Sequence, residues 1–273
     1  MTSATYLDRI IAEHRAEASR DERPLDALRR TASAMPPPRP FRAALGAQGL
    51  SVVAEIKRRS PSKGPLFADL DPATLARLYS DGGAACLSVL TDGPNFGGSA
   101  EDLAAARSAT ALPTIRKDFT VSERDVLDAR IMGADAVLLI AAALSGDEII
   151  RLMGLARELL LDVLVETHDE AELESALAAG ADLVGVNQRD LVTFEVDHER
   201  AARMGKLMPA EVTSVAESGV RGPDDAAMLA DVGYDAVLVG ESLVTSGDPA
   251  AAVASLRTGT QQGQSDERRS ACS

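Results

Sequence analysis

Short runs of apolar residues recur along this chain and alternate with segments of helical periodicity. The runs are SVVAEIK (51–57), CLSVLT (86–91), PTIRKDF (113–119), AVLLIAA (136–142), DVLVET (162–167), LVGVNQ (183–188), TSVAES (213–218) and AVLVGES (236–242). Within each run the apolar residues are continuous rather than alternating, which is typical of strands buried on both faces of a parallel sheet. The pattern therefore predicts a strand in each run.

The segments between the runs carry signals for the start and the end of helices. Asp71 is a predicted N-cap with Pro72 at the first helical position. The motif Gly-x-Asp-x-Val recurs at Gly133, Gly180 and Gly233. Each of these glycines is expected to adopt a positive φ where a helix ends and the chain turns into the next strand.

Strand–helix units repeated over residues 51–257 favour one fold class, an α/β protein built as a (β/α)8 TIM barrel. A doubly wound parallel sheet is the alternative. A doubly wound sheet would rarely need so many evenly spaced strand–helix units. A dinucleotide site of that fold usually requires Gly-x-Gly-x-x-Gly after the first strand, and this chain has no such motif there. We therefore expect a catalytic barrel over residues 51–257.

Two segments lie outside the predicted barrel. Residues 5–18 place Leu7, Ile10, Ile11 and His14 on one helical face, and a second short helix is expected over 24–31. We expect residues 1–50 to form an N-terminal helical extension that packs on one mouth of the barrel. Residues 258–273 lack apolar periodicity and are predicted to be a disordered tail.

Composition and charge narrow the possible partners. The 273 residues are 45% apolar and only 3% aromatic, and the net charge of −14 argues against nucleic acid and anionic membranes. No apolar run reaches membrane-spanning length and no signal peptide opens the chain, which favours a cytoplasmic location. The two cysteines give no disulfide framework, and Cys86 lies in an apolar run typical of a core. The three histidines lack ligand spacing, so no metal site is expected.

Charged and polar residues follow most of the apolar runs at the same end. Because active sites of such barrels lie at the carboxyl ends of the strands, these residues should converge on one polar site able to transfer protons. Glycines after the seventh and eighth strands, Gly219 and Gly240, would let an anion approach the backbone, as in a phosphate site. The residues at the strand ends are Glu55, Lys57, Lys117, Asp118, Glu166, Asn187, Arg189, Glu217, Ser218 and Gly240.

These blocks resemble the indole-3-glycerol-phosphate synthase family of tryptophan biosynthesis. AEIKRRSPSKG, LSVLTD…FGGS, IRKDF, LVET, GVNQRDL, AESGV and LVGESL follow that family's order and spacing over residues 5–255. The related phosphoribosylanthranilate isomerase would lack EIKRRSPSKG and the long N-terminal extension. A barrel retained only as a binding or scaffold subunit is the other alternative, against which the full set of acids and bases argues.

The resemblance implies a reaction and a role for each matching residue. The reaction is ring closure of 1-(2-carboxyphenylamino)-1-deoxyribulose 5-phosphate to indole-3-glycerol phosphate with loss of CO₂ and water, catalysed by a carboxy-lyase that needs no cofactor and no metal. Lys117 would be the general acid and Glu166 the base or proton shuttle of the dehydration. Lys57 would neutralise the substrate carboxylate, and the division of labour between the two lysines stays open.

The remaining residues would position and bind the substrate. Glu55, Asn187 and Glu217 would orient and polarise the catalytic groups, and Arg189 would lie near the carboxylate. The other implied binding residues are Ser60, Ser218, Gly219, Gly240 and the backbone of Glu241, for phosphate and ribulose hydroxyls, and Phe96, Phe119 and Leu138, for the anthranilate ring. We expect a small phosphorylated substrate and a monomer, or at most a weak homodimer.

Overall fold

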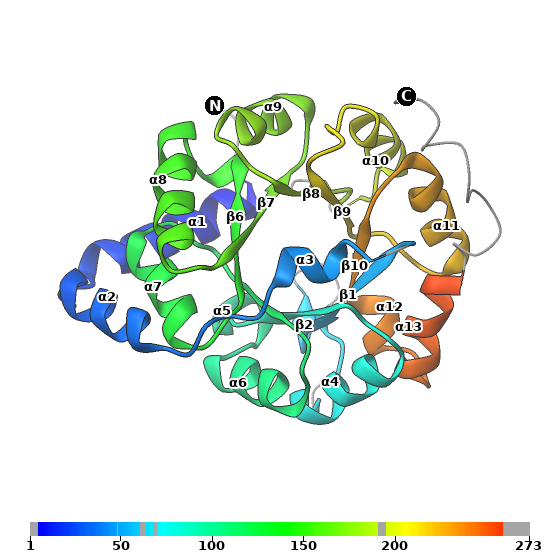
Figure 1. Ribbon diagram of the computed structural model, residues 1–273, viewed down its shortest axis with the longest axis horizontal. Coiled ribbons are helices and arrows are strands. Elements are labelled where there is room, and N and C mark those ends of the chain that lie inside the picture. Colours follow the sequence, from blue (N-terminus) through cyan, green and yellow to red (C-terminus); the bar gives the residue numbers. More distant parts are fainter. Residues whose placement is uncertain (1–4, 48, 61–63, 68–69, 191–194, 259–273) are drawn as a thin grey trace.

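A closed barrel of parallel strands, ringed by helices, forms the body of the molecule (Figure 1). The computed structural model describes residues 5–47, 49–60, 64–67, 70–190 and 195–258. In chain order around the barrel, the strands are β1 (Ser51–Ile56), β4 (Cys86–Leu90), β5 (Thr114–Lys117), β6 (Ala136–Ile140), β7 (Asp162–Thr167), β8 (Leu183–Asn187), β9 (Thr213–Glu217) and β10 (Ala236–Val239). The predicted strands and the (β/α)8 barrel are confirmed.

Helices cover the outside of the barrel between successive strands. The outer helices are α4 (Pro72–Asp81), α6 (Ala100–Ala109), α7 (Glu123–Ile131), α8 (Gly146–Glu158), α9 (Glu170–Ala178), α10 (His198–Gly205), α11 (Pro223–Val232) and α13 (Pro249–Thr258). Asp71 caps α4 by accepting a hydrogen bond from the Thr74 backbone, as predicted. Gly133, Gly180 and Gly233 have φ angles of 88°, 83° and 109°, so these three predicted turns are also confirmed.

Smaller elements sit in the loops at the carboxyl ends of the strands. The loop after β1 contains an antiparallel pair, β2 (Arg59–Ser60) and β3 (Gly64–Pro65), which the apolar pattern did not predict. Helix α5 (Gly93–Phe96) follows β4, the 3₁₀ turn η1 (Ala141–Ala143) follows β6, and α12 (Glu241–Val244) follows β10. These elements surround the mouth of the barrel.

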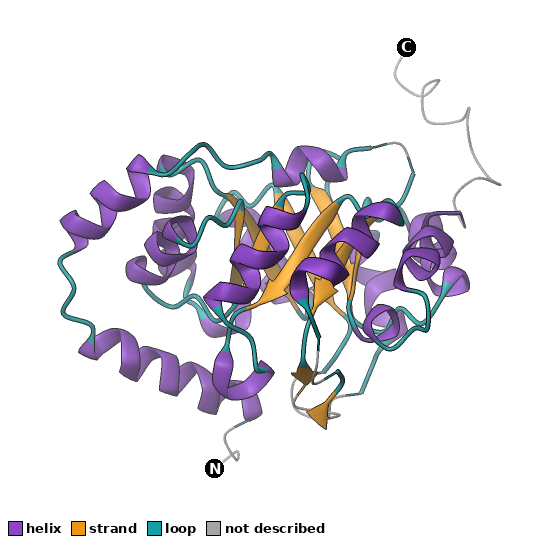
Figure 2. Cartoon of the chain, turned by 90° about the horizontal axis from the view of Figure 1, so that it is seen from below, coloured by secondary structure: helices purple, strands orange, loops and turns teal. Residues whose placement is uncertain are grey.

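The N-terminal helices reach both ends of the barrel. Helix α1 (Tyr6–Arg20) lies at the end where the strands terminate, α2 (Leu25–Ala34) packs beside α7, and α3 (Phe41–Leu45) lies at the opposite end (Figure 2). Two of these helices were predicted, with ends that differ by one to three residues, whereas α3 was not. Phe41 and Leu45 are fully buried, so α3 closes the bottom of the barrel.

The division of the chain into an N-terminal extension (1–50), a barrel (51–257) and a tail (258–273) stays a prediction. The predicted tail lies outside the described residues, apart from Thr258 at the end of α13. Cys272 lies in that tail, while Cys86 is fully buried in the barrel, as its apolar run indicated. None of the helices formed by the described residues combines the length and the hydropathy of a bilayer-spanning segment.

The aspartates of the Gly-x-Asp motif hold the bottom of the barrel together. Asp135 accepts hydrogen bonds from the backbones of Arg39 and Thr114 at 2.7 and 2.9 Å. Asp182 accepts one from the guanidinium of Arg42 at 2.9 Å. At Gly133 and Gly180 the motif thus supplies a turn through its glycine and an anchor for the segment from α2 to α3 through its aspartate.

Candidate active site

One cavity with a volume of about 630 Å³ opens at the carboxyl ends of the barrel strands. Its size suits a small organic ligand. Every residue that the sequence assigned to the site lines this cavity, namely Glu55, Lys57, Ser60, Phe96, Lys117, Phe119, Leu138, Glu166, Asn187, Arg189, Glu217, Ser218, Gly219, Gly240 and Glu241. The predicted convergence of Lys57, Lys117 and Glu166 is therefore present in the fold.

Strand periodicity explains why these side chains face inward. Side chains two residues apart on a strand point to the same side. Ile115, Leu164 and Val215 belong to the apolar cluster that fills the barrel. Lys117, Glu166 and Glu217 each lie two positions after one of these residues. They therefore point inward as well, at the mouth of the barrel.

Lys117 is the centre of the charged network. Its Nζ lies 2.6 Å from Oε2 of Glu166 and 3.2 Å from Oε2 of Glu217. In barrel order β9 stands opposite β5, so the Lys117–Glu217 contact crosses the mouth of the barrel. Asn187 donates a hydrogen bond from Nδ2 to Oε1 of Glu166 at 3.0 Å, which leaves Oε2 of that carboxylate facing the lysine.

Burial and mutual contact move the pKa values of these groups apart. Burial alone would raise the pKa of Glu166, but Lys117 and His168 outweigh it and hold that pKa well below its usual value. Burial raises the pKa of Glu217 to about 8, since Lys117 offsets only part of the cost and Glu166 adds negative charge. Burial would lower the pKa of Lys117, but Glu166, Glu217 and Glu55 raise it. One ionised carboxylate, one carboxyl that retains its proton near neutrality and one ammonium thus share the site.

A second ion pair lies at the end of β1. Nζ of Lys57 is 2.6 Å from Oε1 of Glu55, and the hydroxyl of Ser88 donates to Oε2 of Glu55 at 3.3 Å. A Cβ atom at Gly240 would lie only 2.6 Å from Oε1 of Glu55. This glycine therefore makes room for the Glu55 carboxylate, in addition to the anion-binding role inferred from the sequence.

Another glycine makes room for Glu217. A Cβ atom at Gly185 in β8 would lie 2.0 Å from Oε1 of Glu217. That oxygen is buried and has no hydrogen-bond partner among the described residues. Gly185 was missed at the sequence level, although its place two residues before Asn187 on the inward face of β8 could have indicated it.

Helix α1 and the loops after β4 and β5 form an apolar wall of the cavity. Leu7 and Ile10 of α1 line it together with Phe96 and Phe119, whose rings lie 6.2 Å apart between centroids. The hydroxyl of Tyr6 donates to Oδ1 of Asn95 at 2.9 Å, which ties the start of α1 to α5. The N-terminal extension thus contributes directly to the site.

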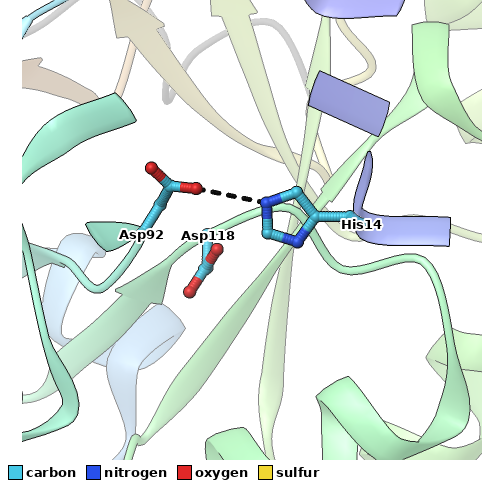
Figure 3. Close-up of side chains that lie close together, drawn as sticks. All are labelled: His14, Asp92 and Asp118. Atoms are coloured by element: carbon cyan, nitrogen blue, oxygen red, sulfur yellow. Dashed lines mark hydrogen bonds and ion pairs between the residues drawn. The ribbon is translucent and has the colours of Figure 1, made fainter. Parts of the chain in front are cut away.

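His14 also fastens α1 to the rim of the barrel. Figure 3 shows the imidazole reaching from α1 toward Asp92, with Asp118 beside it, and Nε2 lies 3.1 Å from Oδ2 of Asp92. The hydrogen bond to Asp92 is the main cause that raises the pKa of His14, although burial opposes the shift. The imidazole ring also lies 5.1 Å from that of Phe119.

The fold therefore gathers a histidine and two aspartates that looked scattered in sequence, within 4.8 Å of one another. Both aspartates already have protein partners. Asp92 caps α5 by accepting from the backbones of Asn95 and Phe96, and Asp118 pairs with Arg116 at 2.8 Å. A cation there would compete with a guanidinium, so the group is better described as a fastening for α1.

The loops after β9 and β10 form the opposite side of the cavity. Ser218 and Gly219 have φ angles of 67° and 77°, and the Ser218 carbonyl accepts a hydrogen bond from Nε2 of Gln188 at 2.8 Å. The hydroxyl of Ser242 donates to the Val220 carbonyl at 2.9 Å. This hydrogen bond joins the two loops.

Comparisons with known proteins identify the family of this chain. The family model described as indole-3-glycerol phosphate synthase matches residues 7–256. The chain belongs to the indole-3-glycerol phosphate synthase family. Relatives bearing that name include one from Mycobacterium ulcerans, 48% identical over 260 residues, which are 94% of this chain and 96% of the relative. Another, from Parafrankia, is 51% identical over 254 residues, 92% of this chain and 95% of the relative.

A solved structure shares the fold at lower identity. Thiamine phosphate pyrophosphorylase from Pyrococcus furiosus superposes with a TM-score of 0.59 and 18% identity, covering 81% of this chain and 97% of the other. At that identity the likeness shows the barrel fold alone. The indole-3-glycerol phosphate synthase family model, in contrast, includes most of α1 and so covers the helix that walls the cavity.

His168 is a further residue of the site that sequence reasoning set aside. It directly follows β7 and its side chain is only 10% exposed. Its Nε2 lies 3.4 Å from Oε1 of Glu166 and its Nδ1 lies 3.0 Å from Oε2 of Glu172. No metal-ligand spacing points to it, but its position two residues after Glu166 was a signal available in the sequence.

Proposed function

We propose that this chain is an indole-3-glycerol phosphate synthase that closes the pyrrole ring of its product inside the cavity described above. The observation that carries the proposal is the buried contact of 2.6 Å between Lys117 and Glu166. Ring closure needs a proton donor where oxyanion charge develops and a base for the later proton removal, close together and shielded from water. An ammonium and an ionised carboxylate in one enclosed site meet that requirement.

The layout of the cavity fits a long substrate with two anionic ends. In barrel order β5 and β6 stand opposite β9 and β10. The apolar wall with Phe119 and Leu138 therefore faces the loops that contain Gly219 and Gly240 across the charged centre. An anthranilate ring would lie against the first side and a phosphate at the second, with the ribulose carbonyl beside Lys117 between them.

The chemistry then divides among the charged residues. The aromatic carbon that bears the carboxylate attacks the carbonyl carbon, while Lys117 donates a proton to the developing alkoxide. Loss of CO₂ from the same aromatic carbon restores the ring electrons, and loss of the new hydroxyl as water with a neighbouring proton completes the indole. Glu166 accepts the proton from the neighbouring carbon and passes it to the departing hydroxyl, which leaves as water. The lowered pKa of Glu166 allows this, because the carboxylate is ionised at neutral pH.

Lys57 and Arg189 line the cavity and would bind the substrate carboxylate. Lys57 is paired with Glu55 at 2.6 Å, so this assignment requires Nζ to turn toward the bound ligand. Ser60, Ser218 and the backbone of Glu241 would add hydrogen bonds to phosphate and hydroxyls. We further propose a cytoplasmic enzyme that acts as a monomer or a weak homodimer and needs neither metal nor cofactor.

A direct test uses the purified protein with 1-(2-carboxyphenylamino)-1-deoxyribulose 5-phosphate and a chelator. The chain contains no tryptophan, so indole fluorescence reports product without background from the protein itself. We expect indole-3-glycerol phosphate and one equivalent of CO₂ to form. A folded protein that yields neither product would contradict the proposed function.

A further inference from the structure

His168 is a strongly buried titratable residue that borders the Lys117–Glu166 network and has no role in the proposed mechanism. His168 lies outside the set of described residues that line the cavity, yet its imidazole contacts the Glu166 carboxylate from behind. Buried polar groups that contact a reacting group usually fix its orientation. This contact therefore concerns the catalytic carboxylate rather than the substrate.

The imidazole is itself held in place from the side of α9. Oε2 of Glu172 lies 3.0 Å from Nδ1 of His168 and also accepts the His168 backbone N–H at 2.8 Å. Glu172 stands in the first turn of α9, where Asp169 caps the helix. A chain of contacts thus runs from the outer helix through the imidazole to Oε1 of Glu166.

The two oxygens of the Glu166 carboxylate have different surroundings. Oε1 lies near both Nδ2 of Asn187 and Nε2 of His168, at 3.0 and 3.4 Å. Oε2 lies 2.6 Å from Nζ of Lys117. Two groups on one oxygen leave the other directed at the lysine, which is the geometry that proton transfer in the cavity requires.

We propose that His168, oriented by Glu172, is a positioning residue that keeps the Glu166 carboxylate ionised with Oε2 turned toward the reacting atoms. This inference rests on the proposed function, because it concerns the same reaction. The charged groups that act on the pair are Lys117 on β5 and Glu217 on β9, on the cavity side, and Glu172 on α9 behind. Glu55 on β1 acts in turn on Lys117 and Glu217.

The charge state of the imidazole supports the proposal. Burial lowers the pKa of His168, but Glu166 and Glu172 together raise it to about 9. The ring is therefore a cation at neutral pH and stabilises the ionised form of Glu166. Removing that cation should raise the pKa of Glu166. The acid limb of the pH profile, where kcat falls because Glu166 becomes protonated, should then lie at higher pH than in the wild-type protein.

Two substitutions separate orientation from charge. His168→Gln can keep an amide donor near the place of Nε2 but loses the charge, whereas His168→Asn is too short to reach Glu166. We expect His168→Asn to lower kcat at least about tenfold, since misplacing a reacting group by about 1 Å can cost about 10² in rate. His168→Gln should lose less at the plateau of its pH profile. In both variants the acid limb of kcat should move up by about 1–3 pH units, with KM changed less than about threefold.

Glu172→Gln tests the same chain of contacts without altering the residue next to Glu166. It should also move the acid limb to higher pH, by a smaller amount. The control Glu174→Gln, at an exposed position of the same helix, should leave kcat and the pH profile unchanged. If the His168 variants keep the wild-type kcat and acid limb and change only thermal stability, the residue is structural and the proposal is wrong. A rise in KM alone would overturn it as well.

A measurement without turnover keeps this test separate from that of the proposed function. The chain has only three histidines, so the imidazole signals can be assigned by NMR from single substitutions. The pKa of His168, about 9 in the wild-type protein, should fall in Glu166→Gln, and an unchanged value would refute the coupling. If the wild-type protein forms no indole product while this coupling is observed, the proposed function fails and the contact between the two residues stands.

Discussion

Replacing Lys117 by methionine tests the proposed chemistry at its centre. The change keeps most of the side-chain volume but removes the cation that lies 2.6 Å from Glu166 and 3.2 Å from Glu217. A positioned general acid typically contributes a factor of about 10²–10⁴, so kcat should fall by that factor, or about 3–5 kcal/mol of transition-state stabilisation. KM should change far less, because the ground-state carbonyl gains little from an ammonium.

The same substitution should also make stability depend on pH in a defined direction. Without Lys117 the pKa values of both buried carboxyls rise above those in the unfolded chain. The folded protein then holds protons that the unfolded chain releases, so its free energy of unfolding falls as pH rises above about 4.5. Breaking a buried pair costs about 3–5 kcal/mol, and we expect the loss relative to wild type to be larger at pH 8 than at pH 6.

Steady-state indole fluorescence and thermal unfolding at both pH values measure these effects. Lys206→Met is the matched control, since Lys206 is exposed at the end of α10 and should affect neither quantity. If Lys117→Met kept kcat within a few-fold of wild type and raised KM instead, Lys117 would be a binding residue. Lys57 would then be the better candidate for the general acid.

Three further substitutions test other parts of the account. Gly185→Ala should lower kcat at least about tenfold, because its Cβ would lie 2.0 Å from Oε1 of Glu217 and displace that carboxyl. The control Gly154→Ala, with no atom within 4 Å of its Cβ, should be active and slightly more stable. His14→Ala should raise KM about tenfold with little effect on kcat, since a hydrogen bond to a charged group contributes about 1.5 kcal/mol or more. An unchanged KM would show that α1 needs no such fastening. Asp135→Asn should lower the free energy of unfolding by about 3 kcal/mol in chemical denaturation and leave kcat unchanged, because this buried anchor lies at the bottom of the barrel.

The barrel and the composition of its site were predictable because both depend on local patterns. Continuous apolar runs mark strands buried on both faces, and the residues that follow them meet at one rim whatever the details of the loops. Lys117 and Glu166 could be placed in this way. The close contact between them could not, since it depends on how two side chains from strands on either side of β6 are oriented at the mouth.

Features that arise from contacts between distant segments were not predictable. His14 and Asp92 are 78 residues apart, and only the folded chain brings them together at the rim. The place of Gly185 on the inward face of β8 could be inferred from the sequence, but its close approach to Glu217 on the neighbouring strand could not. Helix α3 is five residues long and too short for a clear periodicity, yet its Phe41 closes the bottom of the barrel.

The division of labour between Lys117 and Glu166 is tested most directly by timing CO₂ release against indole formation in a single turnover of Glu166→Gln. If Lys117 drives ring closure and Glu166 acts in the dehydration, CO₂ should appear in a burst of about one equivalent per site. Indole absorbance should follow at least about a hundredfold more slowly, the lower end of the usual contribution of a general base. Lys117→Met should instead slow both signals together. If CO₂ and indole slowed equally in Glu166→Gln, the carboxylate would act at or before ring closure, and the assignment of roles made here would be contradicted.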